Sequence, residues 1–124
     1  MVLMEEDKES IGLQEDEIHS HFYADYSGED FRKAKEKLCL EPLLPSGTPV
    51  YLSDEKFGSV PRVYIEGLKD KAIPIQLQRA MYKQTICEQV ITMDSDHSPF
   101  FSHPKELTSH LIQLTLERAE ENER

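Results

Sequence analysis

The chain has 124 residues, a formal net charge of −10 and 31% charged residues, a composition typical of a globular protein in water. The acidic balance argues against a nucleic acid partner, because phosphate binding needs a basic surface. No apolar run reaches the roughly 20 residues of a membrane span, and no basic segment followed by an apolar one marks a secretory signal. We therefore expect a cytoplasmic protein without a membrane partner.

Both ends of the chain are rich in carboxylates. Residues 1–17 are predicted to form a loose acidic arm, and residues 119–124 a charged tail. An acidic interaction surface is the alternative interpretation of these ends. Cys39 and Cys87 have no CxxC partner, so we expect two reduced thiols, with one disulfide between them as the alternative.

Residues 18–58, hereafter the cap-like segment, are predicted to be partly helical. Apolar residues at helical spacing favour a first helix within 14–26. Ser27 is a candidate N-cap with Asp30 three residues later, a weak capping box that predicts a second helix over 28–38.

The rest of this segment is predicted to be mostly irregular. Residues 41–50 contain three prolines and a glycine, which argues against regular structure for most of the stretch. Ser53 is a candidate cap for one further helical turn, which would end near Gly58.

Residues 59–118 alternate strands with helices. Residues 62–66 are β-branched and aromatic and predict a strand, and residues 89–93 predict another. Pro74 fits the first turn of a helix between them, and Pro104 opens a long helix after the second strand. This order predicts an α/β fold, in which a βαβ unit with parallel strands and a right-handed crossover is covered by a C-terminal helix.

Two loops leave the carboxyl ends of these strands, where α/β proteins gather catalytic groups. Asp70 lies in the first loop and His97 in the second. Neighbouring parallel strands bring the loops together, so we predict an Asp70–His97 hydrogen bond in which the carboxylate fixes the imidazole tautomer. The alternative is a capping aspartate and a solvated surface histidine. A metal site of Asp94, Asp96 and His97 is disfavoured, because adjacent residues cannot all converge on one ion; we expect no metal and no cofactor.

The run RVYIEGLKDKAIPIQLQRAMYKQ and the following VITMDSDHSPFFSHPKELTSHLIQL resemble the closing segment of the esterase and hydroxynitrile-lyase branch of the α/β-hydrolase superfamily. Upstream, FYADYSGEDFRKAKEKL and PLLPSGTPVYLSDEKFGSVPR are similar to the end of the small helical cap in related bacterial members. The resemblance covers roughly residues 20–116. Its matching residues are, in chain order, Asp70, Ile73, Pro74, Gln78, Arg79, Asp96, His97, Pro104, Glu106 and Leu107.

The resemblance implies that Asp70 is the acid of a catalytic triad and that His97 is its general base. In the lyase branch a lysine follows the histidine, whereas Ser98 follows it here, so the resemblance favours an ester or lactone hydrolase. The chain departs from the family in lacking the nucleophile elbow G-x-S-x-G. None of its five glycines has a serine two residues later.

We therefore expect a partial α/β-hydrolase fold that is inactive alone, as the C-terminal part of an esterase-like enzyme from a truncated gene or a split reading frame. The alternatives are a non-catalytic binding or assembly module on the same scaffold and an unrelated small acidic α/β domain. A two-stranded sheet under two helices makes a thin core with an unpaired strand edge. We expect the chain either to self-associate or to need a complementing chain.

Overall fold

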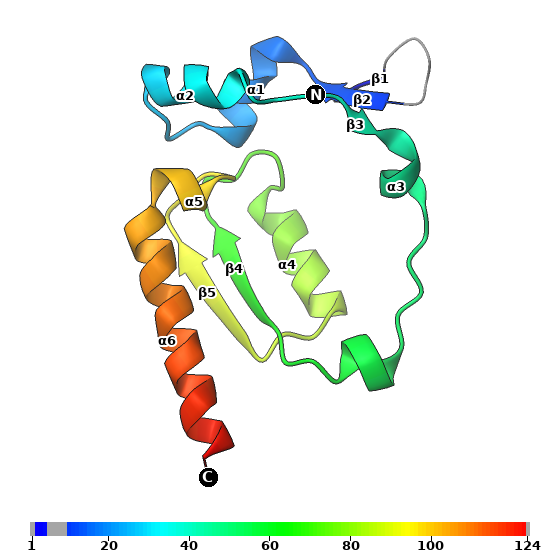
Figure 1. Ribbon diagram of the computed structural model, residues 1–124, viewed down its shortest axis with the longest axis vertical. Helices are drawn as coiled ribbons and strands as arrows, with labels where there is room; N and C mark the ends of the chain where they lie inside the picture. The colour runs from blue at the N-terminus through cyan, green and yellow to red at the C-terminus, as the bar shows by residue number, and fades with distance from the viewer. Residues whose placement is uncertain (1, 5–9, 124) are drawn as a thin grey trace.

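The computed structural model describes residues 2–4 and 10–123. Its centre is a pair of parallel strands, β4 (Val63–Gly67) and β5 (Gln89–Met93), which are in register from Val63 opposite Gln89 to Gly67 opposite Met93. Helix α4 (Ile75–Gln84) connects them, and β5 is followed by the short helix α5 (Pro99–Ser102) and the long helix α6 (Pro104–Asn122). In Figure 1 the strands run between α6 and α4. The predicted strand–helix–strand–helix order and the parallel pairing are confirmed.

The packed core of this unit is small. Met93 at the end of β5 is fully buried, and Ile18 and Tyr26 of the cap-like segment are nearly so. Several large apolar side chains on the strands and helices stay substantially exposed: Leu77, Met81, Val90, Leu111, Ile112 and Leu116. Because each buried apolar side chain contributes about 1.5–3 kcal/mol, this exposure leaves the βαβα unit with little hydrophobic stabilisation of its own.

The cap-like segment begins with two short helices, which lie over the carboxyl ends of the strands (Figure 1). Helix α1 (Glu15–Phe22) ends earlier than the predicted helix within 14–26, and α2 (Gly28–Lys35) ends before residue 38. The Ser27 hydroxyl accepts a 3.2 Å hydrogen bond from the backbone N–H of Asp30, so the predicted N-cap is confirmed.

Ser53 also acts as a cap. Its hydroxyl accepts a 3.3 Å hydrogen bond from the backbone N–H of Lys56, and the turn η1 (Asp54–Gly58) follows. The turn ends at Gly58, as predicted, but it is a π-helical turn.

The prediction of a loose arm over residues 1–17 was wrong for three stretches of it, one of which is the start of α1 at Glu15. Strands β1 (Val2–Met4) and β2 (Ser10–Leu13) pair antiparallel, and β2 pairs in turn with β3 (Glu41–Pro42). The remainder of the arm between β1 and β2 lies outside the described residues. Backbone N–H and C=O groups form such a ladder whatever charge the side chains carry, so an acidic segment can pair without contributing to a core.

One further prediction was wrong because proline was given too much weight. Residues 41–50 contain a short helix, α3 (Leu43–Gly47), beside β3. Pro45 is its third residue, where a backbone N–H would have no intrahelical acceptor in any case. The charged tail at 119–124 forms the end of α6 as far as Asn122, because glutamate is a good helix former.

Two smaller predictions concern cysteine chemistry and the membrane. Cys39 and Cys87 are both free thiols, so the prediction of reduced cysteines is confirmed. Within the part of the chain that the structure describes, no helix combines the length and the apolar character needed to cross a bilayer.

Candidate active site

Asp70 and His97 lie together beyond the carboxyl ends of β4 and β5. His97 Nδ1 is 3.0 Å from Asp70 Oδ2, so the predicted hydrogen bond is present. The Asp70 side chain is 10% exposed and that of His97 is 30% exposed. The carboxylate is thus largely shielded from water, whereas part of the imidazole faces outward, where a reacting group can reach it.

The two oxygens of the Asp70 carboxylate have different partners, one in the backbone and one on the histidine. Oδ1 accepts a 2.8 Å hydrogen bond from the backbone N–H of Ile73, and Oδ2 faces His97 Nδ1. A carboxylate is acceptor-only, so this contact favours the tautomer with its proton on Nδ1. The lone pair of Nε2 is then free to accept a proton, and no residue of the described chain hydrogen-bonds to it.

The loops that carry the pair are joined by backbone contacts that continue the β4–β5 ladder. The N–H of Leu68 donates to the Met93 carbonyl at 3.0 Å, and the N–H of Lys69 donates to the Ser95 carbonyl at 3.0 Å. Gly67 permits this approach. A Cβ atom at position 67 would lie 3.1 Å from the Ser95 carbonyl oxygen and 3.2 Å from that of Asp96.

Asp96 fixes the loop on the histidine side and is 1% exposed. Its Oδ1 accepts from the backbone N–H of Ser98 and from the Ser102 hydroxyl, both at 3.0 Å. Its Oδ2 accepts from the backbone N–H of Asp25 at 3.0 Å. Sequence reasoning gave Asp96 only as a residue of the family pattern and as a disfavoured metal ligand, whereas the structure makes it the hub between the cap-like segment and the His97 loop.

Aromatic side chains extend this contact to the imidazole itself. The ring of Phe22 meets that of His97 edge to face, with centroids 5.1 Å apart at 89°. The Ser98 hydroxyl donates to the Phe22 carbonyl at 2.7 Å. Tyr26 stacks on Phe101 at 4.4 Å, and its burial raises the pKa of the Tyr26 hydroxyl to about 12. The cap-like segment therefore forms an apolar wall beside His97.

The metal interpretation gains no support from the geometry. Asp94 pairs with Lys69 at 2.9 Å, and Asp96 is occupied by the donors described above. Among residues 2–4 and 10–123, no group of three or more histidine, cysteine, aspartate or glutamate side chains is arranged to hold a metal ion.

The sequence and the fold of the chain were compared with those of known proteins. No family model matches the chain. It is 40% identical over 75 residues to putative methylesterase 13, chloroplastic, of Arabidopsis thaliana, an alignment that covers 60% of this chain and 17% of that protein. It is 31% identical over 112 residues to the pyrethroid hydrolase of Sphingobium wenxiniae, which covers 86% of this chain and 40% of that protein.

Solved structures of esterases resemble the fold of this chain. Polyneuridine aldehyde esterase superposes with a TM-score of 0.78 at 25% identity, over 86% of this chain and 43% of that one. Methylesterase MES16 from Arabidopsis superposes with a TM-score of 0.74 at 26% identity, over 86% and 46%. The chain belongs to the α/β-hydrolase superfamily. It corresponds to the C-terminal part of that fold and spans less than half the length of each of these relatives.

An α/β-hydrolase also needs a nucleophile, and the described residues supply none to His97. The Ser98 and Ser102 hydroxyls donate to Phe22 and Asp96, and Ser95 is fully buried. Within the described chain, no serine, threonine or cysteine side chain hydrogen-bonds to the imidazole. The described residues therefore hold a hydrogen-bonded aspartate and histidine, but no hydroxyl or thiol group among them is bonded to that histidine.

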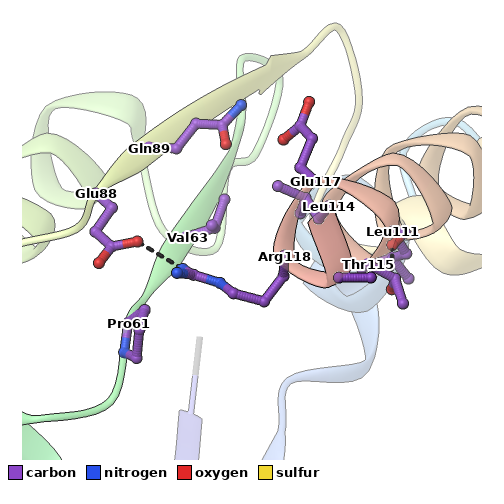
Figure 2. A pocket seen from close by; sticks show the side chains of 10 residues that line it. Pro61, Val63, Glu88, Gln89, Leu111, Leu114, Thr115, Glu117 and Arg118 are labelled. Carbon is purple, nitrogen blue, oxygen red and sulfur yellow. Dashed lines mark hydrogen bonds and ion pairs between the residues drawn. The ribbon is translucent and has the colours of Figure 1, made fainter. Parts of the chain in front are cut away.

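A pocket among the described residues of this α/β-hydrolase chain lies away from the pair. It has a volume of about 760 Å³ and separates α6 from the first residues of β4 and β5, including Val63 and Gln89. Figure 2 shows Glu88 and Arg118 joined across it by a 2.6 Å ion pair. Because Asp70 and His97 follow the opposite ends of these strands, the pocket is a packing gap under α6 rather than part of the candidate active site.

Proposed function

We propose that this chain provides the acid and the general base of an ester-hydrolysing site, with Asp70 as the acid and His97 as the base. The observation that carries the proposal is the 3.0 Å contact between Asp70 Oδ2 and His97 Nδ1, which leaves Nε2 free. Nε2 then takes the proton of an attacking hydroxyl and later returns it to the leaving alcohol. Asp70 holds the productive tautomer and stabilises the imidazolium formed between the two steps.

We further propose carboxylic esters, including lactones, as the substrate class. The relatives that support this choice are named methylesterases and a pyrethroid hydrolase. Ser98 stands directly after His97, where the lyase branch has a lysine, and its hydroxyl is turned to the Phe22 carbonyl. Phe22 and the other aromatic side chains of the cap-like segment favour an ester with an apolar group over one with a charged group.

Hydrolysis by this pair requires a second polypeptide segment that supplies the nucleophile and the oxyanion donors. Among the described residues, β4 pairs on one side only, with β5, so its other edge is available to another strand. The exposed apolar side chains of α4 and α6 lie on the same βαβα unit. We propose that a segment bearing the nucleophile docks on this edge. The alternative role as a non-catalytic assembly module has less support, because it would not require the Asp70–His97 geometry.

A reducing compartment such as the cytoplasm is the setting we propose for the chain. The support is the pair of free thiols, Cys39 and Cys87. The word chloroplastic in the names of some relatives describes those proteins.

The test is complementation. The chain is fused through a flexible linker to the portion of the Sphingobium pyrethroid hydrolase outside the matched region, and hydrolysis of 4-nitrophenyl acetate is measured. We expect turnover from the fusion and none above free imidazole from either piece alone. Asp70→Asn should lower turnover by about 10⁴-fold, because the wrong tautomer is favoured. Turnover that His97→Ala leaves unchanged would contradict the proposal, as would turnover by the unfused chain that a serine-directed inhibitor abolishes.

A further inference from the structure

Gln78 is a buried polar residue on α4 that faces the Asp70 loop. Only 2% of its surface is exposed. Its Oε1 accepts a 3.1 Å hydrogen bond from the backbone N–H of Gly67. Its Nε2 donates to the Gly67 carbonyl at 3.0 Å and to the Ile73 carbonyl at 2.7 Å. The amide thus uses its acceptor and both of its donor hydrogens on backbone groups.

These three bonds bracket the loop that carries the acid. Gly67 is the last residue of β4, Ile73 lies two residues before α4, and Asp70 lies between them. Ile73 is fixed twice, since its carbonyl accepts from Gln78 and its N–H donates to Asp70 Oδ1 at 2.8 Å. A continuous path therefore runs from Gln78 through Ile73 to the carboxylate and on to His97.

No other common side chain reproduces this arrangement. Glutamate has the same length but, when ionised, has no hydrogen to donate to the two carbonyls. Methionine has a similar volume but leaves the half-buried N–H of Gly67 and carbonyl of Ile73 without the Gln78 amide as a partner, which is costly. The next residue, Arg79, contacts a different part of the molecule, because its guanidinium donates to Glu66 of β4 at 3.1 and 3.2 Å.

We propose that Gln78 is the positioning residue that holds Asp70 in its hydrogen-bonding geometry with His97. The role rests on the proposed function of that pair. Gln78 touches neither the imidazole nor the space around Nε2, and it acts through the backbone of the acid loop. It sets the direction of the Asp70 carboxylate and, through it, the tautomer of His97.

The experiment reads the tautomer directly in the full chain labelled with ¹⁵N-histidine. The ring nitrogen shifts are recorded above neutral pH, and His97→Gln assigns the His97 signals among the five histidines. We expect His97 in the unmodified chain to carry its proton mainly on Nδ1. In Gln78→Met the signals should move toward the tautomer mixture of a free imidazole. Hydrogen exchange of the Ile73 amide should accelerate at least tenfold relative to the amides of β5.

Arg79→Met is the matched control. It loosens α4 from the sheet without touching the acid loop, so it should lower the melting temperature and leave the His97 tautomer unchanged. If Gln78→Met does not fold, Gln78→Asn, whose shorter amide cannot reach both ends of the loop, is measured in its place. A folded Gln78 variant that keeps the proton on Nδ1 and the protection of Ile73 would overturn the positioning role.

The failure of this role and that of the proposed function are distinguishable. A tautomer that depends on Gln78, found together with an inactive fusion protein, would support the positioning role and count against ester hydrolysis. An unmodified chain without the Nδ1-protonated tautomer would overturn the positioning role outright.

Discussion

The carboxylate of Asp96 accepts a 3.0 Å hydrogen bond from the backbone N–H of Asp25, a residue 71 positions earlier in the chain. The same carboxylate holds the backbone of Ser98, so one buried group fastens the cap-like segment to the loop that carries His97. The cap-like segment and the acid–histidine pair are therefore parts of a single structural unit, and a change in one is expected to reach the other.

The first prediction concerns Asp96→Asn. The amide keeps the shape of the carboxylate but replaces one acceptor with a donor, so the N–H of Asp25 or the groups at Oδ1 lose a partner. We expect a loss of about 1–3 kcal/mol in the free energy of unfolding, measured by urea denaturation, together with faster hydrogen exchange at Asp25. Asp94→Asn is the control. The Asp94 side chain is 73% exposed, so its change should stay within about 0.5 kcal/mol. Equal effects of the two substitutions would contradict this account.

The second prediction concerns Gly67→Ala. The added methyl group would meet two backbone carbonyl oxygens, those of Ser95 and Asp96, at 3.1 and 3.2 Å, and neither can rotate away. The two loops must separate, so we expect a destabilisation of about 1–3 kcal/mol and a weaker Asp70–His97 contact. Gly28→Ala offers a matched comparison, because nothing lies within 4 Å of its added carbon. It should be neutral or slightly stabilising in the same thermal melts. A Gly67→Ala variant as stable as the unmodified chain would show that the loops are not so closely apposed.

The third prediction is a pH dependence that arises at Glu66. This carboxylate is 3% exposed, and the hydrogen bond from the Arg79 guanidinium, aided by Thr92, holds the pKa of Glu66 below its ordinary value of 4.5. A depressed pKa in the folded state stabilises the fold above pH 4.5, and this contribution is lost as the pH falls through the folded-state pKa. The stability difference between the unmodified chain and Glu66→Gln should therefore shrink from pH 6 to pH 3. Urea denaturation at a series of pH values measures it.

Glu29→Gln is the control for this dependence. Glu29 pairs with Lys33 on the surface of α2, and its side chain is 70% exposed. Exposed ion pairs contribute little, so the profile of this variant should follow that of the unmodified chain. Parallel profiles for Glu66→Gln and the unmodified chain would mean that the buried pair does not respond to acid in this way.

The sequence predicted the pair but not the residues that hold it. Asp70 and His97 were found because each follows a strand with a clear β-branched pattern, and parallel strands bring such loops together. Gln78 was named only as a residue of the family pattern, and Asp96 only in that pattern and as a ligand of a disfavoured metal site. A polar residue on a helix, or beside a histidine in an acidic turn, has the same local pattern whether it faces water or a buried backbone. The contacts of Gln78 with Gly67 and Ile73, and of Asp96 with Asp25, can be seen only in the three-dimensional structure.

The small antiparallel sheet was missed for a related reason. Its pairing depends on backbone groups of β2 and β3, which are separated by two helices in the chain. Side-chain patterns within about ten residues do not indicate a strand partner that lies so far along the chain. The two-stranded β4–β5 sheet was predictable because its strands and crossover helix are consecutive.

The last prediction concerns association. In the described chain β4 pairs only with β5, and α6 exposes Ile112 and Leu116 at 56% and 60%. An open strand edge recruits other strands, and exposed apolar side chains elsewhere on the unit add to the tendency to associate. We expect the chain to self-associate when no complementing segment is present, with a melting temperature that rises with protein concentration. Light scattering after size exclusion, combined with thermal melts over a hundredfold range of concentration, measures both effects.

The double substitution Ile112→Gln and Leu116→Gln separates association from folding. Both side chains are already more than half exposed, so their replacement should cost the isolated chain little stability. It should shift the chain toward the monomer and flatten the concentration dependence of the melt. Gln113→Ala, at a polar position on the same helix, should change neither. A monomeric unmodified chain at high concentration, with a sharp melt independent of concentration, would contradict the prediction. That outcome would mean that the small core around Met93 is sufficient to stabilise the fold.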